Sequence, residues 1–380
     1  MNVRPSYRYD IFTASGSFES ACRGVLSQAA ALPGQLVRLV FFGQVGSRDS
    51  YLHQCGVIAS LVDEIFGDRS PVCSYVPQPV MGGVVALECH SADDGAQVSY
   101  KKLSGAGYVT VECGSFKEVV AGGLRGDIGT ALSVQCAALF AVARDILAAE
   151  GMEVDDIVRQ WNYIEDITGF VGEFQNYQVF NDARTRFYSL GRWSGGYPAA
   201  TGIGAGPCGV VVDFNSMRGG DVEIVALDNP LQTPAHGYSQ EVLVGAEDDF
   251  FAQRTTPKFE RGKAVLSAGS MMCYVSGTAS IRGEESVAVG DVLAQTATTM
   301  ENIDCLTSSD NLKRYGAVRP VGRGRYDMLR VYVKRADDME SVRDYMTARY
   351  PDTHMVFLHT DVCRDELLVE IEGIVSYAGA

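Results

Sequence analysis

The chain has 380 residues, with 32 Lys and Arg against 47 Asp and Glu, which gives a net charge of −15. This balance argues against nucleic-acid binding, because such a surface must be basic to displace counterions from phosphates. With 46% hydrophobic and 21% charged residues, the composition is that of a globular protein long enough for two or three domains. Any anionic substrate must therefore be bound by locally placed Arg or Lys side chains.

No secretion or membrane signal is expected. Residues 1–11 lack the apolar core of a signal peptide, and the most apolar stretch, 131–149, contains Gln135, Arg144 and Asp145. The ten cysteines form no C-x-x-C pair, and the five histidines show no H-x-x-x-H or H-x-H spacing. The sequence therefore predicts reduced, buried cysteines, a cytoplasmic protein without membrane contact, and no metal site.

The N-terminal part predicts one helix among three strands. The strands cover residues 36–42, 72–76 and 84–90, and the helix covers 51–66. The middle part repeats this order after an added front half, which consists of a strand at 108–112 and a long helix at about 127–150, capped by Gly151. A strand at 157–164, a helix at 177–190 and a strand at 210–215 follow.

The last part shows the same order again. Its added front half is a strand at 272–276 and a helix at 291–306, and a strand at 328–334, a helix at 338–350 and strands at 354–360 and 367–374 follow. We therefore expect an α+β protein built from three similar units, a shortened one at 1–105 and full ones at 106–217 and 259–380. Residues 218–258 lack periodicity and are interpreted as an irregular insertion.

Three sequence clusters carry a resemblance. Residues 198–204 read PAATGIG, residues 274–281 read YVSGTASI with Gly283, Glu285 and Ser286 after them, and residues 363–372 read CRDELLVEIE. Together with Trp161–Ile164, Tyr177 and Arg184, they resemble the chorismatase family, the chorismate-hydrolysing branch of the RidA (YjgF) superfamily. The resemblance covers most of the chain.

The resemblance implies fused RidA-like (chorismate-mutase-like) domains, with mixed β-sheets, helices packed on one face and a pseudo-trimeric arrangement within one chain. We therefore expect a monomer or a weak dimer, with an active site between the middle and last units. The implied reaction is hydrolysis of chorismate to pyruvate and a ring acid, either 3-hydroxybenzoate or a dihydroxy-cyclohexadiene carboxylate. No metal or organic cofactor is implied.

Cleavage of an enol ether requires a proton at its methylene carbon, and a carboxylic acid that stays protonated near neutral pH is the natural donor. The resemblance assigns this role to Glu285, for which the alternative is an exposed glutamate in a glycine-rich turn. The family commonly has His at the preceding position, where this chain has Glu284. A carboxylate there either raises the pKa of Glu285 or points to solvent.

Chorismate carries two carboxylates, which suit bidentate contacts from arginine. Arg364 matches the family motif before the final strand, and Arg184 and Arg261 are further candidates, with exposed charges as the alternative. Tyr177 is interpreted as a hydrogen-bond donor to a carboxylate or as a packing residue.

Two small residues complete the predicted site. Ala200 and Thr278 stand where family members vary, so the resemblance implies that they shape the ring pocket, with simple packing as the alternative.

Two other functions remain open. The first is an enamine or imine deaminase of the simpler RidA type, in which Arg364 would bind the substrate carboxylate. The second is a binding protein without catalysis, which the presence of Glu284 favours.

Overall fold

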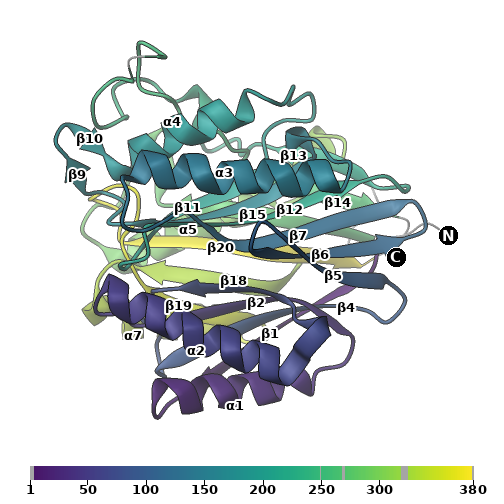
Figure 1. The fold of residues 1–380 in the computed structure, drawn as a ribbon. Helices are drawn as coiled ribbons and strands as arrows, with labels where there is room; N and C mark the ends of the chain where they lie inside the picture. Colours follow the sequence, from purple (N-terminus) through teal and green to yellow (C-terminus); the bar gives the residue numbers. More distant parts are fainter. Residues whose placement is uncertain (1–3, 249, 268–269, 318–323, 379–380) are drawn as a thin grey trace.

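The computed structural model describes residues 4–248, 250–267, 270–317 and 324–378. It contains three α+β units in chain order, each a mixed sheet with helices packed on it (Figure 1). The long strands of each unit are buried at most positions because both faces of the sheet are covered, one by helices and one by the other units.

The first unit has a four-stranded sheet in the order β1-β4-β2-β3. Its helices begin at serine caps, since the hydroxyls of Ser17 and Ser47 accept from the amides of Ser20 and Ser50. Its elements are β1 (Tyr7–Ala14), α1 (Phe18–Ala30), β2 (Gln35–Gly43), α2 (Arg48–Phe66), β3 (Val72–Val76) and β4 (Val85–Ala92).

The second unit has a six-stranded sheet in the order β11-β8-β12-β7-β6-β5, with α3 and α4 packed together on it. A small hairpin of β9 (Phe170–Val171) and β10 (Phe174–Gln175) precedes α4. The main elements are β5 (Gln97–Leu103), β6 (Ala106–Cys113), β7 (Phe116–Arg125), α3 (Leu132–Ala149), β8 (Ile157–Glu165), α4 (Asn176–Tyr188), β11 (Ala199–Ala205) and β12 (Val210–Arg218).

The third unit has a six-stranded sheet in the order β13-β14-β15-β20-β18-β19. A two-residue hairpin, β16 (Ile281–Arg282) and β17 (Glu285–Ser286), leads from β15 to α5. The other elements are β13 (Glu223–Leu227), β14 (Gly262–Ser267), β15 (Ser270–Ala279), α5 (Val292–Leu306), α6 (Ser309–Arg314), β18 (Arg325–Val333), α7 (Met339–Arg349), β19 (His354–His359) and β20 (Val369–Ala378).

The three sheets have one topology. Starting from the parallel pair of each sheet, the order is β3-β2-β4-β1, β11-β8-β12-β7 and β19-β18-β20-β15. The second and third sheets then add two outer strands each, which the first sheet lacks. The expected repetition of an α+β unit, with a shorter copy at the N-terminus, is therefore confirmed at the level of topology.

The units close into a ring. The edge strand of each parallel pair contacts the strand that stands fourth in the common order of the next unit: β3 contacts β7, β11 contacts β15, and β19 contacts β1. At the centre, each sheet contributes one buried arginine from the same position of its central strand, namely Arg38, Arg159 and Arg330. All three guanidinium groups lie over the ring of Trp161, at 4.7, 4.6 and 5.4 Å from its centroid.

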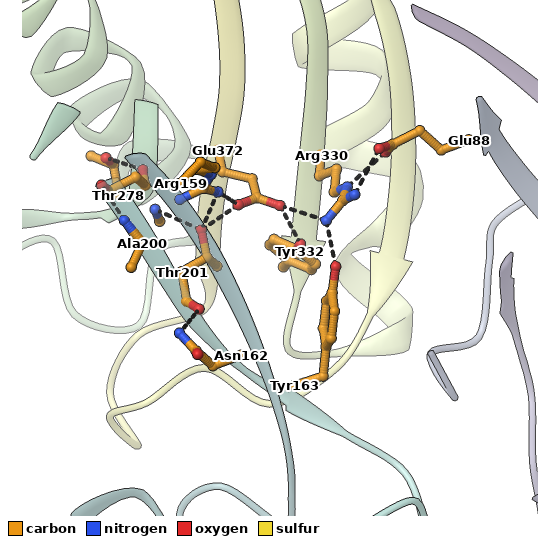
Figure 2. A network of polar contacts seen from close by, with 12 residues as sticks. Glu88, Arg159, Asn162, Tyr163, Ala200, Thr201, Thr278, Arg330, Tyr332 and Glu372 are labelled. Atoms are coloured by element: carbon orange, nitrogen blue, oxygen red, sulfur yellow. Dashed lines mark hydrogen bonds and ion pairs between the residues drawn. The ribbon is translucent and has the colours of Figure 1, made fainter. Parts of the chain in front are cut away.

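Two carboxylates neutralise part of this charge (Figure 2). Glu88 accepts from Arg330 at 2.6 and 2.7 Å, and Glu372 accepts from Arg330 at 3.0 Å and from the hydroxyl of Tyr332 at 2.7 Å. Glu372 also accepts from Arg159 and from the hydroxyl of Thr201. Arg159 and Arg330 are thus paired with carboxylates, which offsets part of the cost of burying their charges, whereas Arg38 donates to the backbone carbonyls of Ala121 and Phe214.

Several expectations need correction. The segment predicted to be irregular, 218–258, contains β13, which pairs with β14. The second sheet starts with β5 at residue 97, before the expected boundary at 105/106. The strand β5 is short and largely polar, so it lacks the apolar run that marks the buried strands. The domain boundaries themselves remain predictions.

The long helix was predicted from about residue 127, but α3 begins at Leu132. Asp127 instead forms a turn, in which its carboxylate accepts from the amide of Gly129 and its carbonyl accepts from Thr130. By length and apolarity α3 is the one described helix that would suffice to cross a membrane. It packs against β7, β12 and α4, which accounts for its apolar character.

Candidate active site

A pocket lies where the second unit meets the third, at the contact of β11 with β15. About 750 Å³ of space lies between its walls, and this figure includes space open to solvent. Its walls come from α4, β11, β15, β20 and residues 238–244 and 257–261. Two hydrogen bonds join the strands beside it: the amide of Ala200 donates to Oγ of Ser276 at 2.9 Å, and the amide of Gly277 donates to Oγ1 of Thr201 at 3.0 Å.

Glu370 supplies the buried carboxyl group of this pocket. It lies on β20, lines the pocket and is 5% exposed. Burial raises its pKa to about 8, and the negative charge of Glu372, two residues along the same strand, adds to this effect. Arg159 and Arg261 lower the pKa by a smaller amount. At neutral pH the Glu370 carboxyl group is therefore mostly protonated.

Glu370 has a counterpart in each of the other units. The equivalent acids are Glu88, Asp213 and Glu370. In each sheet, the acid pairs across the strands with the residue two positions after the central arginine. Burial favours the neutral form of Glu88, but Arg330 and His90 outweigh it and hold the pKa of Glu88 well below its ordinary value. Asp213 accepts from the hydroxyl of Ser74 at 2.7 Å and from the amide of Gly123 at 2.8 Å.

Among the residues that the structure describes, no hydrogen bond contributes to the pKa of Glu370, whose side chain lines the pocket. Of the three equivalent acids, it is the one that lines this pocket. Two glycines make room there. A Cβ atom on Gly277 would lie 2.1 Å from Oε1 of Glu370, and a Cβ atom on Gly202 would lie 2.9 Å from the ring of Tyr177.

Two arginines line the pocket on either side of Tyr238. Arg261 donates to the Tyr238 hydroxyl at 2.7 Å, and the guanidinium of Arg364 lies 5.3 Å from the centroid of the Tyr238 ring. Arg261 is buried, and its Nε has no hydrogen-bond partner among the described residues. These two cations in a chain of net charge −15 make the pocket suitable for an anionic ligand.

The helix α4 adds polar groups. Tyr177 and Asn181 lie one turn apart and both line the pocket. Burial raises the pKa of Tyr177 well above its ordinary value, so its hydroxyl stays a hydrogen-bond donor. Arg184 donates to Oδ1 of Asn181 at 2.7 Å, which orients the amide with its NH₂ group as the remaining donor.

Residues 116–214 match the family model described as "Chorismatase FkbO/Hyg5-like, N-terminal". Over these residues the chain is similar to the chorismatase FkbO/Hyg5-like family. It is 35% identical over 223 residues to a 3-hydroxybenzoate synthase of Streptomyces hygroscopicus, covering 58% of this chain and 63% of that protein. It is 34% identical over 226 residues to a chorismatase of Streptomyces rapamycinicus, covering 58% of this chain and 64% of that protein. Each match thus spans less than two thirds of the curated relative.

The fold of the family extends over the whole chain. A crystal structure of a chorismatase superposes with a TM-score of 0.73, covering 99% of both chains at 22% identity. At that identity the likeness establishes the α+β architecture with several mixed sheets and leaves the activity to be tested.

Four of the predicted binding residues line the pocket. They come from four different segments of the chain: Tyr177, Ala200, Arg261 and Arg364. Two others lie behind its wall. Arg184 is buried and holds Asn181, and the hydroxyl of Thr278 donates to the carbonyl of Ser276 at 2.8 Å. Both therefore support pocket residues and do not themselves face the cavity.

The expected acid is placed elsewhere. Glu285 is exposed on β17 and is not among the residues that line the pocket. The carboxylate of Glu284 is directed at Ser239 and not at solvent. It accepts from the amide of Ser239 at 2.9 Å and from the Ser239 hydroxyl at 2.8 Å.

The residue that sequence reasoning missed is Glu370. It stands in the predicted final strand, in the motif that carried the resemblance, but no role was assigned to it. A signal was present, since two glutamates in an otherwise apolar strand, at 370 and 372, indicate buried carboxyl groups with a function. Tyr238 was hidden in the segment interpreted as an irregular insertion.

Proposed function

We propose that this chain hydrolyses chorismate to pyruvate and a ring acid, with Glu370 as the general acid. The observation that supports this most strongly is a protonated carboxyl group in a pocket with two arginines. Chorismate has an acid-labile enol ether and two carboxylates, so it needs one proton donor and two cationic contacts.

The first step is protonation of the enol-ether methylene carbon. Glu370 gives up its proton, the carbon–carbon double bond takes it, and the positive charge develops on the ether carbon as an oxocarbenium ion. Water adds to this carbon and returns a proton to the Glu370 carboxylate. The hydroxyl proton of the resulting hemiketal passes to the ring oxygen as the bond between that oxygen and the ketal carbon breaks, which releases pyruvate and a dihydroxy-cyclohexadiene carboxylate.

A 3-hydroxybenzoate product would follow the same first protonation and differ in which oxygen captures the cation. Arg261 and Arg364 bind the two substrate carboxylates, and Tyr177 and Asn181 donate to their remaining oxygens. Ala200, beside Gly202 on the pocket floor, limits the space for the ring. We propose that these residues decide the product.

The decisive experiment measures pyruvate release from chorismate by coupled lactate dehydrogenase, with mass identification of the ring product. We expect turnover by the unmodified chain, loss of turnover in Glu370→Gln, and turnover in Glu285→Gln. Activity retained by Glu370→Gln and lost by Glu285→Gln would reverse the assignment of the acid. Folded protein without any pyruvate release would overturn the proposed function and return attention to ammonia release from enamines or to binding alone.

We also propose that the chain acts in the cytoplasm as a monomer or a weak dimer. The ring of three units is closed within one chain, so no second copy is needed to complete the pocket. Light scattering of the purified chain tests this, and a stable trimer would contradict it.

A further inference from the structure

The hairpin tip at residues 283–284 lies against the segment that forms one pocket wall. Gly283 has a φ of +61°, which suits the tight turn between β16 and β17. Backbone hydrogen bonds join the turn to the preceding segment, from Thr233 to the Gly283 carbonyl at 2.8 Å and from Gly283 to the Leu231 carbonyl at 2.9 Å. Glu284 is thereby held in a fixed place beside the pocket.

Glu284 makes two kinds of contact there. Its carboxylate accepts both hydrogen bonds that Ser239 offers, from the amide and from the hydroxyl. Its backbone carbonyl accepts from Nη1 of Arg364 at 2.8 Å. One residue thus contacts both the pocket wall and a pocket arginine.

Both contacts converge on Tyr238. This tyrosine precedes Ser239 in the chain, accepts a hydrogen bond from Arg261 and stacks under Arg364. Its place therefore sets the distance between the two guanidinium groups. Residues 238–246, which we call the wall segment, also bring Val242, Leu243 and Val244 to the pocket.

The wall segment has a second attachment at its far end. The amide of Ala246 donates to the carbonyl of Glu173 at 2.9 Å. Between its ends the segment forms no regular helix or strand. Gln240 exchanges two hydrogen bonds with the backbone of Arg254, and Nε of Arg254 donates to the Gly245 carbonyl at 2.5 Å. The position of the Tyr238 end therefore depends mainly on Ser239 and its contact with Glu284.

We propose that Glu284 is a positioning residue: it anchors the wall segment through Ser239 and orients Arg364, and so fixes the spacing of the two arginines for a ligand with two carboxylates. The inference rests on the proposed function for its substrate, whereas the anchoring itself does not. A bidentate acceptor is what this anchoring requires. Gln can also hold Ser239 by two hydrogen bonds, one accepted from the amide and one donated to the hydroxyl oxygen, whereas Ala can form neither.

The first readout is hydrogen–deuterium exchange of the wall segment without any ligand. In Glu284→Ala we expect faster exchange at Ser239, about tenfold or more, and unchanged exchange at Ala246, because its partner is Glu173. Glu284→Gln should keep most of the protection. Glu241→Ala is the matched control, since Glu241 is an exposed glutamate within the same segment.

The second readout is steady-state kinetics with chorismate. Glu284→Ala should raise KM by about tenfold with kcat changed less than about threefold, and Glu284→Gln should restore KM. An unchanged Ser239 exchange rate in Glu284→Ala would overturn the anchoring. Faster exchange with unchanged KM in an active enzyme would overturn the role in substrate positioning. Faster exchange in a chain that releases no pyruvate would support the anchoring and refute the proposed function instead.

Discussion

Replacement of Glu370 by Gln tests the proposed acid through two properties that should change in opposite directions. Gln has nearly the same size and shape as a protonated Glu, so the pocket should keep its form. It cannot give up a proton, and general acid catalysis typically contributes about 10²–10⁴-fold to a rate. We therefore expect kcat for pyruvate release to fall by about that factor.

The same change should stabilise the fold at neutral and alkaline pH. The pKa of Glu370 rises from an ordinary value near 4.5 to about 8 on folding. The unfolded chain thus releases this proton near pH 4.5, while the folded chain keeps it up to about pH 8. Since the unfolded state binds fewer protons across that window, the free energy of unfolding falls as pH rises through it.

The size of the effect follows from the width of the window. A difference of about 3.5 pH units, at about 1.4 kcal/mol per unit, corresponds to about 5 kcal/mol as an upper limit. Gln does not titrate, so the variant should escape this loss. The difference in the free energy of unfolding between variant and wild type should therefore grow from pH 4.5 to pH 8 and level off above it.

Urea unfolding monitored by tryptophan fluorescence at pH 5, 6.5 and 8 measures this difference. A constant offset between the two proteins at all three pH values would refute the reasoning, because it would mean that Glu370 titrates alike in the folded and unfolded states. The kinetic counterpart is a fall of kcat/KM in the wild type as pH rises through about 8.

Three further substitutions probe the surroundings of this acid. Gly277→Ala places a Cβ atom 2.1 Å from Oε1 of Glu370. It should lower kcat/KM by about tenfold or more, which corresponds to a loss of about 1.4 kcal/mol of transition-state stabilisation. Activity equal to wild type would contradict the close contact. Arg330→Ala removes the shared partner of the buried carboxylates of Glu88 and Glu372. It should lower the free energy of unfolding, measured by urea titration, by about 3–5 kcal/mol. A loss below about 1 kcal/mol would mean that the central network contributes little. Arg364→Lys keeps the positive charge but loses the planar contact with the Tyr238 ring. KM for chorismate should therefore rise by about tenfold, with kcat nearly unchanged. An unchanged KM would argue that Arg364 acts only as a point charge.

The three units illustrate how one topology can hold acids with different chemistry. Glu88 is ionised because Arg330 and His90 pair with it, and Oδ1 of Asp213 accepts from a hydroxyl and an amide. Glu370 occupies the equivalent place beside Gly277, where the chain leaves open space. Burial without a partner is what gives this carboxyl group its raised pKa.

The sequence by itself determined those strands and helices whose residues show a clear hydrophobic period or form a continuous apolar run. The strands at 72–76 and 157–164 and the helix at 291–306 agree with β3, β8 and α5 to within a residue or two. It also indicated Arg364, Arg261, Tyr177 and Ala200, because residue type and motif suffice to mark cationic and small positions. What it missed locally were elements with weak periodicity, such as β5 and β13, which pair at sheet edges.

Only the tertiary structure showed which carboxyl group lies in the pocket. Glu285 and Glu370 both stand in motifs that carry the resemblance, and residue type cannot separate them. The pKa of Glu370 depends on burial, on Glu372 and Arg261 of its own unit, and on Arg159 of the second unit. Such contacts join residues far apart in the chain, so the electrostatics of the pocket exist only once the ring of three units has closed.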